Sequence, residues 1–175
     1  DRFVLSTLAD LYVLQGNTDG ALALYERLIR EFGPSHQLHF NRGVLLGRLG
    51  RYDEALGELS RALELEPESV EIRMALGLTF ELAGRPDEGR AHYDNAIRLD
   101  PLNPRLHLLA ARAAAERLFA LKNRPTAVFV ASDDMALEVI TVAVAKGLRV
   151  PEDLSVVGFD DNPVAAHSRV PLTTV

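Results

Sequence analysis

The feature that most constrains this chain is a period of 34 residues in its first two thirds. Gly16, Gly50 and Gly84 follow one another at this interval. Five further sets keep the same spacing, namely Ala9/Gly43/Gly77, Tyr12/Leu46/Phe80, Ala21/Ala55/Gly89, Tyr25/Leu59/Tyr93 and Leu28/Ala62/Ala96. A period of this size is typical of arrays in which each unit buries its apolar face against its neighbours. The spacing therefore predicts three successive structural units.

Each unit is expected to contain two helices. Ser35–Leu49 and Val70–Ala83 carry apolar residues at helical spacing and are predicted first helices. Gly50 and Gly84 follow them, and glycine is the residue that best adopts the left-handed conformation of a helix C-terminus. Acidic residues favour the positive end of a helix dipole. The second helices are accordingly predicted to begin at the pairs Asp53-Glu54 and Asp87-Glu88.

This register, and the segment GRYDEALGELSRALELEP in particular, resembles the tetratricopeptide repeat (TPR) family over about residues 2–112. The resemblance implies a helical solenoid whose first helices line a concave groove, and this groove binds a peptide or a partner helix. The ligand-facing positions carried over by register give the predicted partner-binding groove Phe3, Asp10, Phe40, Asn41, Val44, Arg48, Met74 and Leu78. The alternative is that these side chains only pack against adjacent helices.

One TPR subfamily clamps a carboxylate at the C-terminus of its ligand with Lys, Asn, Asn, Lys and Arg. The corresponding positions here are Ser6, Asp10, Asn41, Glu71 and Ala75, of which Asn41 alone agrees. Asp10 and Glu71 would repel a carboxylate. We therefore reject the clamp and expect an apolar groove suited to an amphipathic helix or an apolar peptide.

The pattern changes after a single predicted helix at Pro104–Leu121. Short β-rich apolar runs are typical of buried parallel strands, and a strand, a helix and a strand with short links predict a βαβ unit. The expected elements are a strand at Thr126–Ala131, a helix at Asp134–Lys146 capped by Ser132-Asp133, a strand at Leu154–Phe159 and a third strand beginning at Leu172–Val175. The predicted fold class is thus an α-solenoid followed by a small, partial parallel α/β unit.

The motifs PTAVF, SDDMA, GLRVPEDLSVVGFDD and PLTTV occur in order over about residues 113–175. Together they resemble the effector-binding domain of the lac repressor family, which is periplasmic-binding-protein-like. The resemblance implies a sugar or nucleobase effector at the carboxyl ends of the strands, with Ser132 and Asp160 lining the pocket and Asp133 capping the helix and bracing the loop. The family's second subdomain and DNA-binding segment are missing, so we expect a vestigial site whose Asp160 and Asp161 serve only in a turn.

Three regions follow: repeats at 1–103, a shared or capping helix at 104–121 and the lac-repressor-like segment at 122–175. The helix at 104–121 fits both the TPR and the lac repressor patterns. The junction of the two regions is therefore consistent with a natural fusion, a truncated reading frame or an engineered chimera. So few parallel strands leave sheet face and edges exposed. The α/β segment is therefore expected to pack on the repeats or to self-associate with another copy.

Composition narrows the functions further. The net charge of −6 and pI near 5.4 argue against nucleic-acid and anionic-membrane binding, and the chain has no Cys. Ser132, Ser155 and His167 form no nucleophile motif, and His36 with His39 lacks a third metal ligand in sequence reach. We predict no enzymatic activity, no cofactor, no metal, no membrane span and a bacterial cytoplasmic location. The leading interpretation is a protein-binding scaffold; a fragment of a transcription regulator that senses a small molecule, and a chimera without selected activity, are the alternatives.

Overall fold

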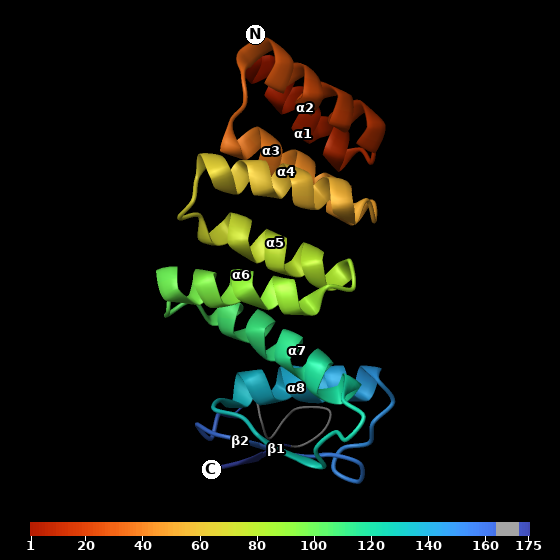
Figure 1. Ribbon diagram of the computed structural model, residues 1–175, viewed down its shortest axis with the longest axis vertical. Coiled ribbons are helices and arrows are strands. Elements are labelled where there is room, and N and C mark those ends of the chain that lie inside the picture. Colours follow the sequence, from red (N-terminus) through yellow and green to blue (C-terminus); the bar gives the residue numbers. More distant parts are fainter. Residues whose placement is uncertain (164–171) are drawn as a thin grey trace. The chain divides into compact units, whose positions relative to one another are not determined.

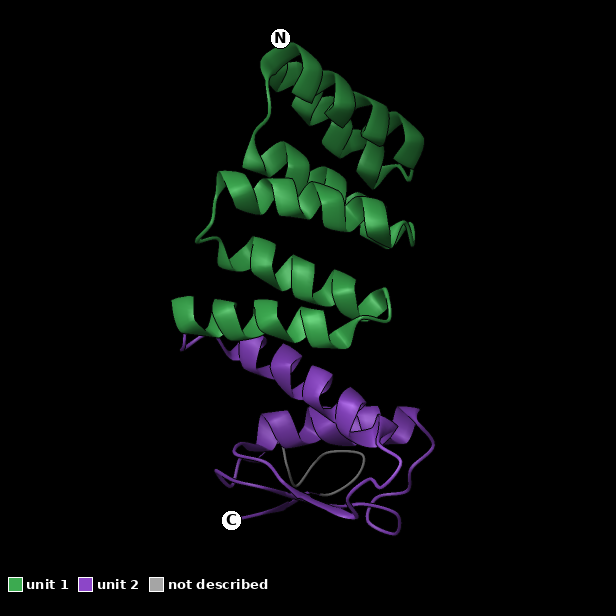
Figure 2. Ribbon diagram, in the orientation of Figure 1, with its two compact units in different colours: residues 1–100 green, residues 101–175 purple. Residues whose placement is uncertain are grey.

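The computed structural model describes residues 1–163 and 172–175 (Figure 1). It divides into two compact units, residues 1–100 and 101–175 (Figure 2). In the described residues, every helix is too short or too polar to span a lipid bilayer. His167, considered above as a catalytic group, lies outside the described residues.

The first unit consists of three helix pairs stacked along the chain, which confirms the predicted repeat array (Figure 1). Its helices are α1 (Arg2–Leu14), α2 (Thr18–Phe32), α3 (His36–Arg48), α4 (Tyr52–Leu65), α5 (Val70–Leu82) and α6 (Pro86–Leu99). Gly16, Gly50 and Gly84 follow the first helices with φ angles of 73°, 74° and 76°. These are left-handed values, so the recurring glycines mark the three turns inside the helix pairs.

The period also pairs a small residue on one helix with a large one on the next. A Cβ atom added to Gly43 would lie 2.8 Å from Cγ of Leu59, and one added to Gly77 would lie 2.4 Å from the Tyr93 ring. In the first pair Ala9 and Tyr25 belong to one buried cluster. Two of the 34-residue sets are therefore the two sides of the same helix–helix contact.

Apolar clusters fill the spaces within and between the repeats. One contains Ala9, Ala21, Tyr25, Leu28, Leu38 and Leu45, and joins the first pair to α3. Another contains Leu56, Leu59, Ala62, Ile72 and Leu76, and joins α4 to α5. Each repeat thus buries part of its apolar surface only when the next repeat is present, as expected for a solenoid.

The second unit contains α7 (Pro104–Ala120), β1 (Ala127–Phe129), α8 (Asp133–Ala145), β2 (Ser155–Gly158) and β3 (Thr173–Thr174). The strands form a parallel sheet in the order β1-β2-β3, with Val128 opposite Val156 and Val157 opposite Thr173. This confirms the predicted βαβ unit with a third strand. The strands are shorter than the apolar runs that predicted them, because pairing ends within the runs.

One face of this sheet is covered by α8, and α7 packs against α8 in turn. Val156 and Leu172 are buried in the resulting cluster, with Val128 packed against it. The alternate residues Ala127 and Phe129 point to the other face, and the Phe129 side chain is 66% exposed. The described core of this unit therefore lies on one side of the sheet.

Candidate functional site

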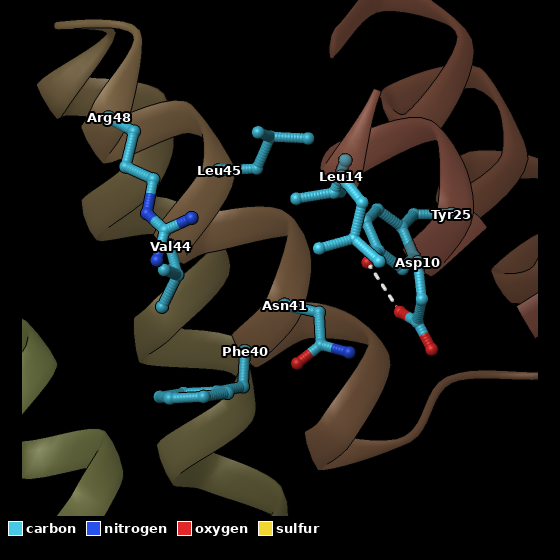
Figure 3. A pocket seen from close by; sticks show the side chains of 9 residues that line it. Asp10, Leu14, Tyr25, Phe40, Asn41, Val44, Leu45 and Arg48 are labelled. Atoms are coloured by element: carbon cyan, nitrogen blue, oxygen red, sulfur yellow. Dashed lines mark hydrogen bonds between the residues drawn. The ribbon is translucent and has the colours of Figure 1, made fainter. Parts of the chain in front are cut away.

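A pocket of about 320 Å³ opens in the first unit where α1, α2 and α3 meet (Figure 3). It is lined by Asp10, Val13, Leu14, Tyr25, Phe40, Asn41, Val44, Leu45 and Arg48. This size is near the lower end of the range of small-ligand pockets and accommodates one or two side chains of a partner. The repeat places α1 and α3 at equivalent positions, so their residues at matching register face the same opening.

Five of the residues predicted from register to face a ligand line this pocket, namely Asp10, Phe40, Asn41, Val44 and Arg48. The other three do not. Phe3 lies in the first turn of α1 and is 76% exposed, while Met74 and Leu78 lie on α5, where Met74 is half-buried and Leu78 is 39% exposed. The pocket is therefore a feature of the first two repeats.

One end of the pocket is a hydrogen-bonding cluster. The Tyr25 hydroxyl donates to Oδ1 of Asp10 at 3.2 Å, drawn as the dashed line in Figure 3. Burial of the phenol, followed by the adjacent Asp10 charge and hydrogen bond, raises the pKa of Tyr25 to about 12. The hydroxyl consequently stays protonated at neutral pH and continues to hold the Asp10 carboxylate. Asn41 completes the cluster, and its Oδ1 accepts a hydrogen bond from Gln37 at 2.8 Å.

Arg48 lies two turns beyond Asn41 on α3, about 10 Å further along the helix axis. Val13, Leu14, Phe40, Val44 and Leu45 provide the apolar part of the lining. Within the part of the chain that the structure describes, neither Asp10 nor Arg48 forms an ion pair. The pocket thus presents a carboxylate and a guanidinium on either side of an apolar surface.

Tyr25 was not among the predicted groove residues. Its register position belongs to a set of large core residues, together with Leu59 and Tyr93, and the side chain is indeed buried. Its ring fills the core while its hydroxyl reaches the pocket. The signal in the sequence was the hydroxyl itself, because a buried tyrosine usually directs its O–H to a partner.

A separate polar network lies buried in the second repeat. Nδ1 of His39 is 2.8 Å from Oε2 of Glu58, and Oε1 of Glu58 accepts from Arg61 at 2.9 Å and from Arg42 at 3.2 Å. His36 faces a different carboxylate, since its Nε2 is 3.3 Å from Glu66. The two histidines therefore do not converge, and the described residues contain no group of three His, Asp or Glu side chains able to hold a metal.

The residues carried over from the lac repressor resemblance lie near the carboxyl ends of β1 and β2. Ser132 caps α8 by accepting the Met135 N–H at 3.4 Å. Asp133 is 1% exposed, and its Oδ2 accepts the backbone N–H of Asn162 at 2.7 Å. Asp160 is exposed, has a φ of 111° and donates its N–H to Val175 at 3.3 Å. In this geometry Ser132 and Asp133 fix the helix start and the loop, while Asp160 is exposed to solvent.

Both parts of the chain match known protein families. The sequence profile of the tetratricopeptide repeat matches residues 6–59 and 40–104, and that of the periplasmic binding protein-like domain matches residues 78–175. The chain belongs to both families. The two matches overlap between residues 78 and 104, in the third TPR pair and the loop after it, so the family boundary is not sharp in sequence.

Solved structures resemble the TPR unit. MamA from AMB-1 aligns with a TM-score of 0.59 and 25% identity, over 67% of this chain and 64% of that one. The first TPR of Spaghetti (RPAP3), bound to the HSP90 peptide SRMEEVD, aligns with a TM-score of 0.60 and 19% identity, over 65% of this chain and 90% of that one. At this identity the second similarity establishes the fold alone.

Curated relatives match the periplasmic binding protein-like part. The probable HTH-type transcriptional repressor ExuR of Bacillus subtilis is 53% identical over 62 residues, which are 35% of this chain and 19% of the repressor. The chain thus spans about a fifth of the length of the curated relatives that it matches first.

Proposed function

We propose that the TPR unit is a binding module that holds a peptide or a partner helix in the pocket formed by α1, α2 and α3. The observation that carries this proposal is the pocket itself, because an apolar lining with polar groups at its ends fits side chains of a partner. Its position on first helices agrees with the TPR resemblance. The RPAP3 neighbour, whose structure contains a bound peptide, gives further support.

We propose binding rather than catalysis for this pocket. A general acid or base is most effective when its pKa lies near the working pH. The pKa of Tyr25, raised to about 12, is far from neutrality. The groups at the pocket ends are suited to hydrogen bonding and charge pairing, which are the interactions that position a ligand.

A second proposal concerns the periplasmic binding protein-like unit. Its matches to bacterial repressors favour descent from a regulator that binds a small effector, and they favour a bacterial cytoplasmic location. Asp133 is occupied by the Asn162 N–H, which leaves Asp160 as the exposed acidic group of the predicted effector site. We expect this site to be vestigial, and a thermal-shift screen against sugars and nucleobases tests it: stabilisation that Asp160→Ala abolishes would contradict the vestigial assignment.

The binding proposal is tested by selecting peptides from a random display library on the immobilised chain. Val44→Glu places a charge in the apolar lining and should abolish capture of the selected peptides. Ser60→Glu introduces the same charge on the exposed face of α4 and should leave capture unchanged. Peptides that bind both variants as well as the native chain would show that the pocket is not the binding site.

A further inference from the structure

We infer that this pocket selects a partner segment in which an apolar side chain lies between a basic and an acidic residue. This inference rests on the proposed function and adds the chemistry of the ligand. It starts from the two charges of the pocket, Asp10 on α1 and Arg48 on α3, which lie on either side of the apolar lining (Figure 3).

Asp10 is exposed, and its carboxylate is oriented by a hydrogen bond from a buried tyrosine. The Tyr25 hydroxyl holds its Oδ1 at 3.2 Å, and Tyr25 is itself buried with 2% exposure. The single hydroxyl donor leaves the negative charge of the carboxylate without a cationic partner among the described residues. A preorganised carboxylate beside an apolar pocket favours a Lys or Arg of the ligand, because charge-assisted hydrogen bonds are the stronger ones.

Arg48 offers the opposite charge. Its guanidinium is also without an ion pair in the described residues, whereas Arg42 and Arg61 of the same repeat are engaged by Glu58. A guanidinium with free donors favours an Asp, a Glu or a terminal carboxylate of the ligand. Val44 and Leu45 belong to the apolar lining, and Figure 3 shows Leu14 between the side chains of Asp10 and Arg48. The apolar side chain of the ligand therefore falls between its own charges.

This arrangement disfavours a ligand whose charged residues are all acidic. Asp10 occupies a position where a carboxylate-binding groove needs a neutral or cationic donor. A like charge placed against it raises the free energy of the complex, and this repulsion provides specificity. The charge pattern of the selected ligand therefore distinguishes this groove from an acid-binding one.

The experiment uses the peptides selected from the random display library. The expected sequences combine an apolar residue with Lys or Arg on one side and Asp or Glu on the other. Asp10→Asn keeps the shape of the side chain and the acceptor for the Tyr25 hydroxyl, and it removes only the charge. It should therefore weaken the binding of such a peptide about tenfold. The same substitution should have no effect on the peptide whose basic residue is replaced by Ala. Arg48→Gln should act in the same way on the acidic residue.

Asp19→Asn and Arg30→Gln are the matched controls, since both residues are exposed on α2 and outside the pocket. Equal effects of Asp10→Asn and Asp19→Asn would overturn the inference, as would selected peptides that are acidic throughout. If Val44→Glu abolishes capture while both charge variants bind normally, the proposed function stands and the charge selection is wrong. If Val44→Glu changes the binding of none of the selected peptides, the proposed function and the charge selection are both wrong.

Discussion

Each unit contains a buried carboxylate, but the hydrogen-bond partners of the two carboxylates differ in kind. In the TPR unit, Glu58 receives the side chains of His39, Arg42 and Arg61, all from the same repeat. In the periplasmic binding protein-like unit, Asp133 receives the backbone N–H of Asn162, 29 residues further along the chain. The positive end of α8, whose first turn contains Asp133, also favours its charge.

The two buried carboxylates therefore stabilise different parts of the structure. Glu58 on α4 binds His39 and Arg42 of α3, so its contribution belongs to the helix pair. Asp133 fixes a loop beyond the end of β2, so its contribution belongs to the site that the loop would form. Replacing each acid should therefore affect a different property, overall stability in the first case and local order in the second.

The largest expected effect comes from Glu58→Ala. Removing one member of a buried ionic network leaves the others unpaired, which costs about 3 kcal/mol of unfolding free energy. Arg61 is largely exposed and recovers water, which places the effect at the lower end of the usual range. Hydrogen exchange of the α3 and α4 amides measures it.

Glu54→Ala provides the control, because Glu54 pairs with Arg51 at 2.7 Å on an exposed surface. Exposed pairs of this kind contribute little to stability, because water and salt screen the two charges. Equal losses for the two variants would mean that burial of Glu58 is unimportant for the helix pair.

Gly77→Ala tests the close packing that distinguishes the TPR unit. The new Cβ would lie 2.4 Å from the fully buried Tyr93 ring, so the helices must separate. Overpacking of this kind costs about 2 kcal/mol. Gly57→Ala meets nothing within 4 Å on an exposed helix face and should stabilise the protein by about 0.5 kcal/mol or more. Urea unfolding, monitored by helix content, measures the free energy of unfolding of both variants. A change of the same sign in both would mean that close packing at Gly77 is unimportant.

Asp133→Ala should produce a smaller and more local effect in the α/β unit. Leaving the Asn162 N–H without its acceptor costs about 1 to 2 kcal/mol, concentrated in the loop. The readout is hydrogen exchange of the Asn162 amide, which should accelerate while the α8 amides change little. Asp134→Ala, the exposed neighbour in the same first turn of α8, should leave this amide unchanged. An unchanged exchange rate of the Asn162 amide in Asp133→Ala would mean that Asp133 does not hold the loop.

The sequence was most informative where a structural constraint recurs. The 34-residue interval predicted the helix pairs because each repeat needs a left-handed glycine and a small residue opposite a large one, as at Gly77 and Tyr93. It did not predict the pocket role of Tyr25 or the burial of Glu58. Both depend on partners from another helix, Asp10 and His39, and such partners follow from packing rather than from register.

The exposed sheet face provides a test with a small effect on stability. Self-association of the second unit stays a prediction, and Phe129 is an exposed aromatic residue on that face. Phe129→Lys should weaken concentration-dependent association in sedimentation experiments while changing the unfolding free energy by less than about 0.5 kcal/mol. Thr141→Lys, exposed on α8, is the control. A native chain that sediments as a monomer at every concentration would exclude this mode of association.

The contribution of the Tyr25 hydroxyl to stability should be small at neutral pH and should change with pH in alkaline solution. Its folded-state pKa of about 12 lies above the ordinary value of about 10 for an unfolded tyrosine. The associated stability is therefore fully present below about pH 10 and is lost as the pH rises towards 12. Tyr25→Phe lacks this group, so the stability difference between the native chain and the variant should shrink across that interval. Asp10→Asn, which removes the neighbouring charge, should lower the pH at which the Tyr25 phenolate absorbance appears. An unchanged titration in Asp10→Asn would mean that burial alone sets the pKa of Tyr25 and that Asp10 does not act on the hydroxyl.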